Sequence, residues 1–105
     1  MTSDLTSTIA ATLAGLGNTA DAVADQLRAR AIKGVRNDEC NCPIARLLLT
    51  LPGVDQVEVG PLSADIYPTG VYWPVEVDLP EAATAFIDHF DEGVYLDLVE
   101  IPAVA

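Results

Sequence analysis

The apolar residues of this chain change their spacing at Pro52-Gly53, and that change limits the folds it can adopt. Within residues 44–51 the apolar side chains recur at intervals of three and four, which is the period of a helix. Beyond Gly53, Val57 and Val59 alternate with polar residues, which is the period of a strand with one buried face. Helical and strand periods in separate blocks predict an α+β fold.

Helix start and stop signals predict four helices. The first covers residues 4–14, and the second is expected to begin after Asn18 as its N-cap and to end at Gly34. Pro43 at a first helical position predicts the start of the third helix. The fourth is expected from Pro80 to Gly93, with its aromatic side chains on one face.

Three short segments with strand character lie between the third and fourth helices. They surround Val57–Val59, residues 64–67 and residues 71–79, and they predict an antiparallel meander with one buried face. Pro74 marks an edge or a bulge because it cannot donate to a ladder. In the third segment the alternation predicts these inward side chains: Val71, Trp73, Val75 and Val77.

The predicted fold class is therefore α+β, with three N-terminal helices, a small three-stranded antiparallel meander and one C-terminal helix packed on the sheet. Residues 1–105 are expected to form a single small acidic domain, since a chain of this length can bury one modest core. The segment from Val94 to Ile101 is either a last strand or a docked extended segment, and the sequence leaves both open.

The net charge of −11 is confined to the second half of the chain. All five basic side chains precede residue 47, where five acids balance them, whereas the other eleven of the 16 acids follow it. Such a field repels nucleic-acid phosphates and anionic lipid and attracts a basic partner. We therefore expect no direct nucleic-acid binding. Acidity that only keeps the domain soluble is an open alternative.

Several features indicate a cytoplasmic protein. No apolar run approaches the roughly 18 residues of a membrane span, so we expect no membrane partner. The N-terminus carries Asp4 and hydroxyl residues where a signal peptide would carry Lys or Arg. The two cysteines, Cys40 and Cys42, are separated by one residue, so a disulfide between them would staple nothing.

Two stretches of sequence carry a family resemblance. Residues 34–48 contain a Cys-Pro helix start, and residues 79–98 contain Phe-Ile-x-x-Phe-Asp-x-Gly-x-Tyr. Together they cover about a third of the chain and resemble short uncharacterised proteins of actinomycetes and their bacteriophages. The resemblance implies a bacterial or phage cytoplasmic setting, and it brings no activity and no catalytic residue with it.

The cysteine pair is a candidate reactive or metal-binding site. Cys42 directly precedes the helix at Pro43, where free amide groups and the helix dipole would stabilise a thiolate. A structural zinc site needs four ligands, and a second ligand pair is missing, so His89 together with an acid would have to complete it from the far end of the chain. The alternative is that Cys42 caps or packs at the helix start, and we predict no bound metal and no cofactor.

Acidic residues near the end of the fourth helix form a second candidate. Asp88, Asp91 and Glu92 gather there with His89. Acids at a helix C-terminus oppose the macrodipole, and such a mismatch can point to function. The alternative is an ordinary exposed helix end.

The outward face of the meander is the third candidate, because tyrosines among acids make a protein-binding surface. A solvated sheet face is the competing interpretation. The side chains predicted to bind a partner, from this face and from the fourth helix, are Glu58, Asp65, Tyr67, Tyr72, Glu76, Asp78, Asp88, Asp91 and Glu92.

Taken together, these features favour a binding protein over an enzyme. The chain has no phosphate-binding glycine loop, no Gly-x-Ser-x-Gly and no His-Glu-x-x-His. The first hypothesis is a small cytoplasmic module, plausibly phage-encoded, that engages a basic host protein through its acidic C-terminal half, in a specific version by mimicking the charge of DNA. The alternatives are a metal- or redox-dependent protein using Cys40, Cys42 and His89, and a homo-oligomer joined at an exposed sheet edge.

Overall fold

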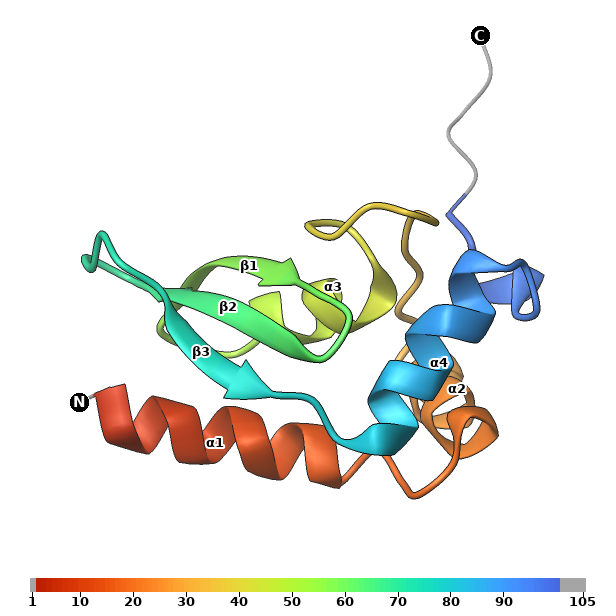
Figure 1. The fold of residues 1–105 in the computed structure, drawn as a ribbon, viewed down its shortest axis with the longest axis horizontal. Helices are drawn as coiled ribbons and strands as arrows, with labels where there is room; N and C mark the ends of the chain where they lie inside the picture. Colours follow the sequence, from red (N-terminus) through yellow and green to blue (C-terminus); the bar gives the residue numbers. More distant parts are fainter. Residues whose placement is uncertain (1, 101–105) are drawn as a thin grey trace, which may run out of the picture.

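Four helices and a three-stranded antiparallel sheet form the fold, in the order that the sequence predicts (Figure 1). The structure is a computed structural model that describes residues 2–100, with side chains from Leu5 onward. The elements, in chain order, are α1 (Thr2–Ala14), α2 (Ala20–Ala29), α3 (Pro43–Leu49), β1 (Val54–Val59), β2 (Ser63–Pro68), β3 (Val75–Asp78), α4 (Glu81–Asp91) and the 3-10 helix η1 (Leu96–Leu98). The α+β class is confirmed.

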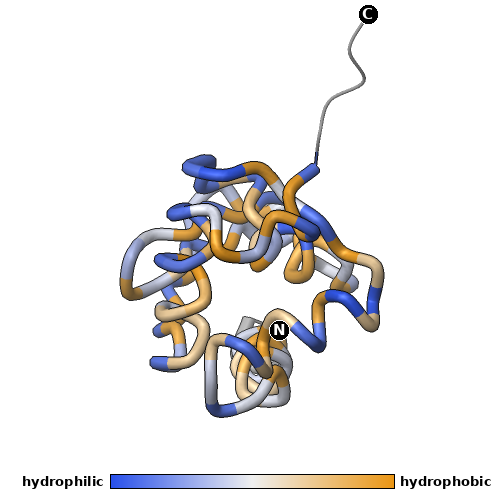
Figure 2. The backbone as a smooth tube through the Cα atoms, turned by 90° about the vertical axis from the view of Figure 1, so that its right-hand side faces the viewer, coloured by the Kyte–Doolittle hydropathy of each residue, from blue (hydrophilic) through white to orange (hydrophobic). Residues whose placement is uncertain are grey.

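The sheet is a meander in which β2 lies between β1 and β3. Residues 60–62 connect β1 to β2, and within this turn the Gly60 amide donates to the Ser63 carbonyl. One face of the sheet is buried, because α3 packs against β1 and α1 packs against β3 (Figures 1 and 2). The side chains on this face are Val57, Val59, Ala64, Ile66 and Val77.

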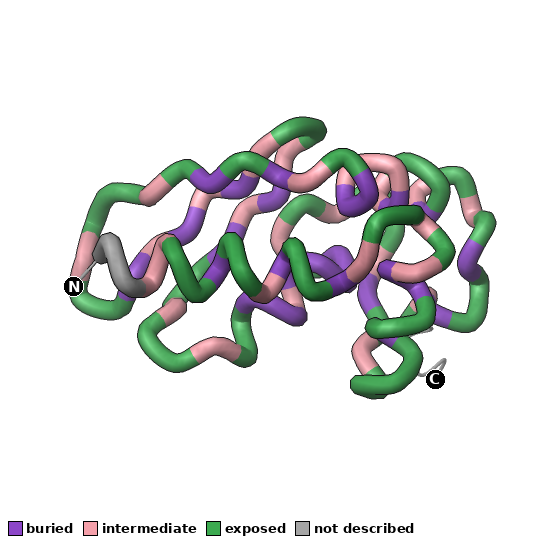
Figure 3. The backbone as a smooth tube through the Cα atoms, turned by 90° about the horizontal axis from the view of Figure 1, so that it is seen from below, coloured by how far each residue is buried: buried purple, intermediate pink, exposed green. Residues whose placement is uncertain are grey.

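Helix α1 covers the sheet with a narrow apolar stripe. Ile9 and Leu13 are buried, and Leu16 continues the stripe just beyond the helix. From Ser7 to Ala14, the opposite side of α1 is exposed (Figure 3). The burial follows the spacing of three and four residues that predicted the helix.

Helix α2 differs from the prediction at both ends. Thr19, not Asn18, is the N-cap, and its hydroxyl accepts from the Ala22 amide at 3.1 Å. The helix ends at Ala29, and Ala31 takes the left-handed turn with a φ of 56°. Gly34 therefore does not close the helix; instead its backbone pairs with the C-terminal segment at Val99.

Helix α3 starts as predicted, with Pro43 at its first position. Cys42 is the N-cap, and its Sγ accepts from the Ala45 amide at 3.4 Å. The helix stops at Leu49, and Gly53 then adopts a φ of 85°, a conformation that favours glycine. This turn delivers the chain into β1.

Strand β3 is shorter than predicted. It begins at Val75, directly after Pro74, which lacks the N–H that a ladder would need. Residues 71–74 form a loop, so Trp73 does not point into the core and is 68% exposed. Of the predicted inward residues, only Val77 is buried, whereas Val71 and Val75 are half-buried.

Helix α4 carries the aromatic core. Phe86 and Phe90 are fully buried, and Phe86 stacks on Tyr95 with ring centroids 5.2 Å apart. The helix was expected on the sheet, but its principal neighbour is α2 (Figure 1). Helix α4 packs on α2 because α1 and α3 already cover the apolar face of the sheet.

The C-terminal segment combines a helical turn with one bridge. After Gly93, whose φ is 90°, the chain forms η1 and then a parallel bridge between Val99 and Gly34. It is thus neither a full strand nor simply extended. The predicted segment ran to Ile101, which lies outside the described residues. None of the helices over residues 2–100 is both long enough and apolar enough to cross a membrane.

Candidate functional site

Three carboxylates form a row across the outer face of the sheet. The register places Glu58 of β1 opposite Asp65 of β2, and Asp65 opposite Glu76 of β3. Neighbouring strands lie about 4.8 Å apart, so each carboxylate has a like charge beside it. We call Glu58, Asp65 and Glu76 the acidic row. Like charges directly opposite one another destabilise a sheet, and the fold nevertheless keeps them.

Two further predicted residues share this face. Tyr67 pairs with Gln56 on one side of the acidic row, and Asp78 pairs with Ser63 on the other. Tyr67 is half-buried, and its pKa is raised by burial and by the charges of Glu58 and Asp65. The structure therefore brings together five of the nine residues predicted to bind a partner.

Basic side chains do not compensate the acidic row. In the described part of the chain, Arg28 and Arg46 form their ion pairs elsewhere, Arg28 with Asp25 and Asp97, and Arg46 with Glu100. The one hydrogen bond to a carboxylate of the acidic row in residues 5–100 is from the Ser63 hydroxyl to Glu76, at 3.3 Å. The negative charge of this face is left for an external counterion.

Two exposed aromatic side chains lie in the loop that joins β2 to β3. Tyr72 is 93% exposed and Trp73 is 68% exposed. Large aromatic side chains are usually at least partly covered, so this loop presents apolar area to solvent at the end of the sheet nearest Tyr67. The sequence predicted an exposed Tyr72 but assigned Trp73 to the core.

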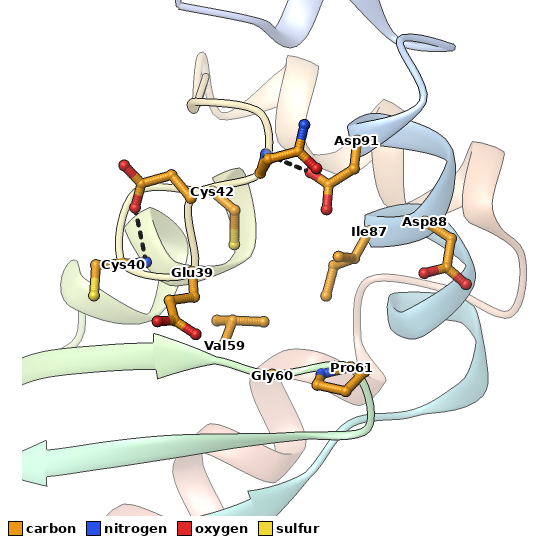
Figure 4. Close-up of a pocket in the computed structure, with 11 residues that line it drawn as sticks. Glu39, Cys40, Cys42, Val59, Gly60, Pro61, Ile87, Asp88 and Asp91 are labelled. Atoms are coloured by element: carbon orange, nitrogen blue, oxygen red, sulfur yellow. Dashed lines mark hydrogen bonds between the residues drawn. The ribbon is translucent and has the colours of Figure 1, made fainter.

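A hollow of about 600 Å³ lies between the loop before α3, the β1–β2 turn and α4 (Figure 4). Asp88 and Asp91 of the predicted set line it, and Ile87 and Asp91 point into it. Its remaining lining includes the apolar Val59 and Pro61. The predicted acids thus divide between two places, the sheet face and this hollow.

The acids at the end of α4 have a structural partner that the sequence did not reveal. The Arg36 guanidinium donates twice to the Asp91 carbonyl oxygen, at 2.7 and 3.1 Å, and the Asp91 carboxylate accepts from the Asn37 amide at 2.9 Å. Arg36 therefore brings a cation to the helix C-terminus and offsets the unfavourable acids there. Glu92, the C-cap residue, is exposed.

The cysteines differ in their surroundings. Cys42 is 3% exposed, and burial raises its pKa to about 11, which outweighs the lowering of the pKa by the backbone amides of Ala45 and Ile44 at the helix start. The capping alternative holds, since Sγ accepts from Ala45. Cys40 is half-buried, and its pKa is also raised, by burial and by the carboxylates of Glu58 and Glu39.

The structure gives His89 a different neighbour from the cysteines. Its ring lies 6.4 Å from that of Tyr95, measured between centroids. Within the described chain, no three side chains of His, Cys, Asp or Glu are arranged to hold a metal ion. The geometry thus offers no support for the site of Cys40, Cys42 and His89.

Comparison with known proteins found no matching family model, no matching curated protein and no matching solved structure.

Proposed function

We propose that this protein is a binding module whose acidic sheet face engages a basic surface of another protein. The observation that supports it is the acidic row, three carboxylates in cross-strand register that receive no ion pair from a described basic residue. A nucleic-acid-binding protein presents such a basic surface, and mimicry of DNA charge is the specific form of the proposal. The setting implied by the family resemblance is a bacterial or phage cytoplasm.

The alternatives have less support. A metal-dependent role needs a ligand set that the described side chains do not form. A homo-oligomer joined at the edge of β3 would bring Glu76 and Asp78 of two copies together, and like charges there would oppose it. Solubility alone explains acidic residues anywhere on a surface, but not their alignment in one row.

A charge-matched pair of variants tests the proposal. The first carries Glu58→Gln and Glu76→Gln, and the control carries Asp55→Asn and Glu81→Gln, both of which are exposed. Both variants lose two negative charges. We expect binding to a panel of purified basic DNA-binding proteins at low salt to weaken at least tenfold more in the first variant than in the control. Equal weakening would mean that net charge alone is responsible.

A further inference from the structure

The acidic row has a direction, and that direction restricts the shape of the partner. Negative charge runs across the three strands, because the row takes one residue from each. Along the strands it is interrupted, because the residue next to Glu58 on this face of β1 is Gln56, and Ser63 and Tyr67 flank Asp65 on β2. Among the paired residues of this face, only β3 contributes a second acid, at Asp78. A ligand that matches these charges lies across the strands.

The dimensions of the acidic row match those of a helix. Two strand spacings of about 4.8 Å give a row about 10 Å long. A helix rises 1.5 Å per residue, so residues i and i+7 are about 10.5 Å apart, and i+3 or i+4 falls between them on the same face. We propose that the acidic row binds a basic α-helix lying across β1, β2 and β3, with Lys or Arg at i, i+3 or i+4, and i+7. This inference rests on the proposed function and adds the partner's shape.

Other occupants match the face less well. An extended basic segment has same-face side chains about 6.8 Å apart, and as a strand added at the edge of β3 it would run parallel to the strands and reach only Glu76 and Asp78. The four residues of β3 follow Pro74, so the edge is short, which discourages pairing. A second copy of this chain would place one acidic row on another, which like charges oppose.

Aromatic side chains flank the acidic row where a bound helix would need contact area. Tyr67 lies on the same face, next to Asp65 along β2, and Tyr72 and Trp73 are exposed in the following loop. Aromatic residues supply much of the affinity in many interfaces, whereas surface charges supply steering and register. On this face, the carboxylates orient the helix and the aromatic loop contacts the methylene stems of its basic side chains.

The test uses three synthetic peptides with identical composition and the whole protein labelled for NMR. The first is an alanine-rich helix with Lys at i, i+3 and i+7. The second places the same lysines around the helix. In the third, two prolines within the sequence keep the peptide extended, whereas the other two peptides carry these prolines at their ends. Titration at low salt measures affinity, and amide shifts show which strands respond. We expect the one-face helix to bind roughly tenfold more tightly, from three ion pairs.

A matched pair of variants locates the contact. Asp65→Asn removes the central carboxylate, and Asp55→Asn removes an exposed acid of β1 outside the acidic row. The helical preference should disappear in the first and persist in the second. Equal affinity for both helical peptides, or tighter binding of the extended one, would overturn the helix inference and leave the proposed function standing. Failure of all three peptides to bind would overturn both.

Discussion

Neutralising the middle of the acidic row should stabilise the protein. Asp65 has a like charge on each side, Glu58 and Glu76, in direct cross-strand register. At about 5 Å in water, each pair is repelled by about 0.8 kcal/mol, and physiological salt reduces this roughly by half. Asp65→Asn removes both pairs and keeps the side-chain shape. The expected gain is about 0.8 kcal/mol at physiological salt, or about 4 °C in melting temperature.

The same arithmetic sets the controls. Glu58→Gln removes one repulsive pair instead of two, so its gain should be about half that of Asp65→Asn. Asp55→Asn removes one negative charge as well, but Asp55 lies outside the acidic row, so this variant should gain little stability.

Urea unfolding followed by circular dichroism measures each free energy of unfolding, at low salt and at about 1 M NaCl. The gain should be largest at low salt and should nearly vanish at high salt, where the Debye length is about 3 Å. Equal stabilities of Asp65→Asn and Asp55→Asn at low salt would refute the repulsion argument. A gain that is independent of salt would refute it as well, because it would point to a local effect of the amide.

Further predictions concern the cysteines and the C-terminal segment. At about pH 8, Cys40 should react slowly with a thiol reagent and Cys42 only on unfolding, as timed by absorbance. Because burial raises the pKa of Cys42 from 9.0 to about 11, its contribution to stability should fall by about 2 kcal/mol between pH 9 and 11, and Cys42→Ala should remove that part of the fall. Gly93→Ala should cost about 1 to 2 kcal/mol in thermal unfolding because of its positive φ. The pKa of Asp97 is lowered by its hydrogen bonds from Arg28, so the pair stabilises the folded protein at pH values above the ordinary carboxyl pKa of 3.8, and this stabilisation is lost in acid. Hydrogen exchange should therefore show that η1 opens more readily in acid. In Arg28→Gln it should open more readily already at neutral pH.

Local signals predicted the elements of this fold, and distant contacts account for the discrepancies. Pro43, Pro80 and Gly93 act through their own backbone geometry, so sequence alone located these helix ends. Thr19 and Asn18 are both good N-caps, and adjacent candidates cannot be separated by pattern. Trp73 continued the alternation of a strand, but Pro74 ended the ladder first.

The candidate site was predictable to the extent that it follows a period of two. Glu58, Asp65 and Glu76 were assigned to one face because alternate residues of a strand share a face. Their alignment in one row depends on strand register, which pattern alone did not give. The Arg36 contact to Asp91 joins residues 55 positions apart, and no local signal marks such a pair.

Gly34 links the folding of the N-terminal part of the chain to residues that are synthesised much later. Its amide donates to the Leu98 carbonyl and its carbonyl accepts from the Glu100 amide, while a Cβ there would lie 2.4 Å from the Pro43 nitrogen. The start of α3 is therefore closed by residues of the C-terminal segment, which are synthesised after the sheet and α4. A nascent chain that stops before Leu98 has its three N-terminal helices and its sheet but not the backbone that covers Gly34. Since contacts of large sequence separation form late, docking of this segment should be the final step of folding.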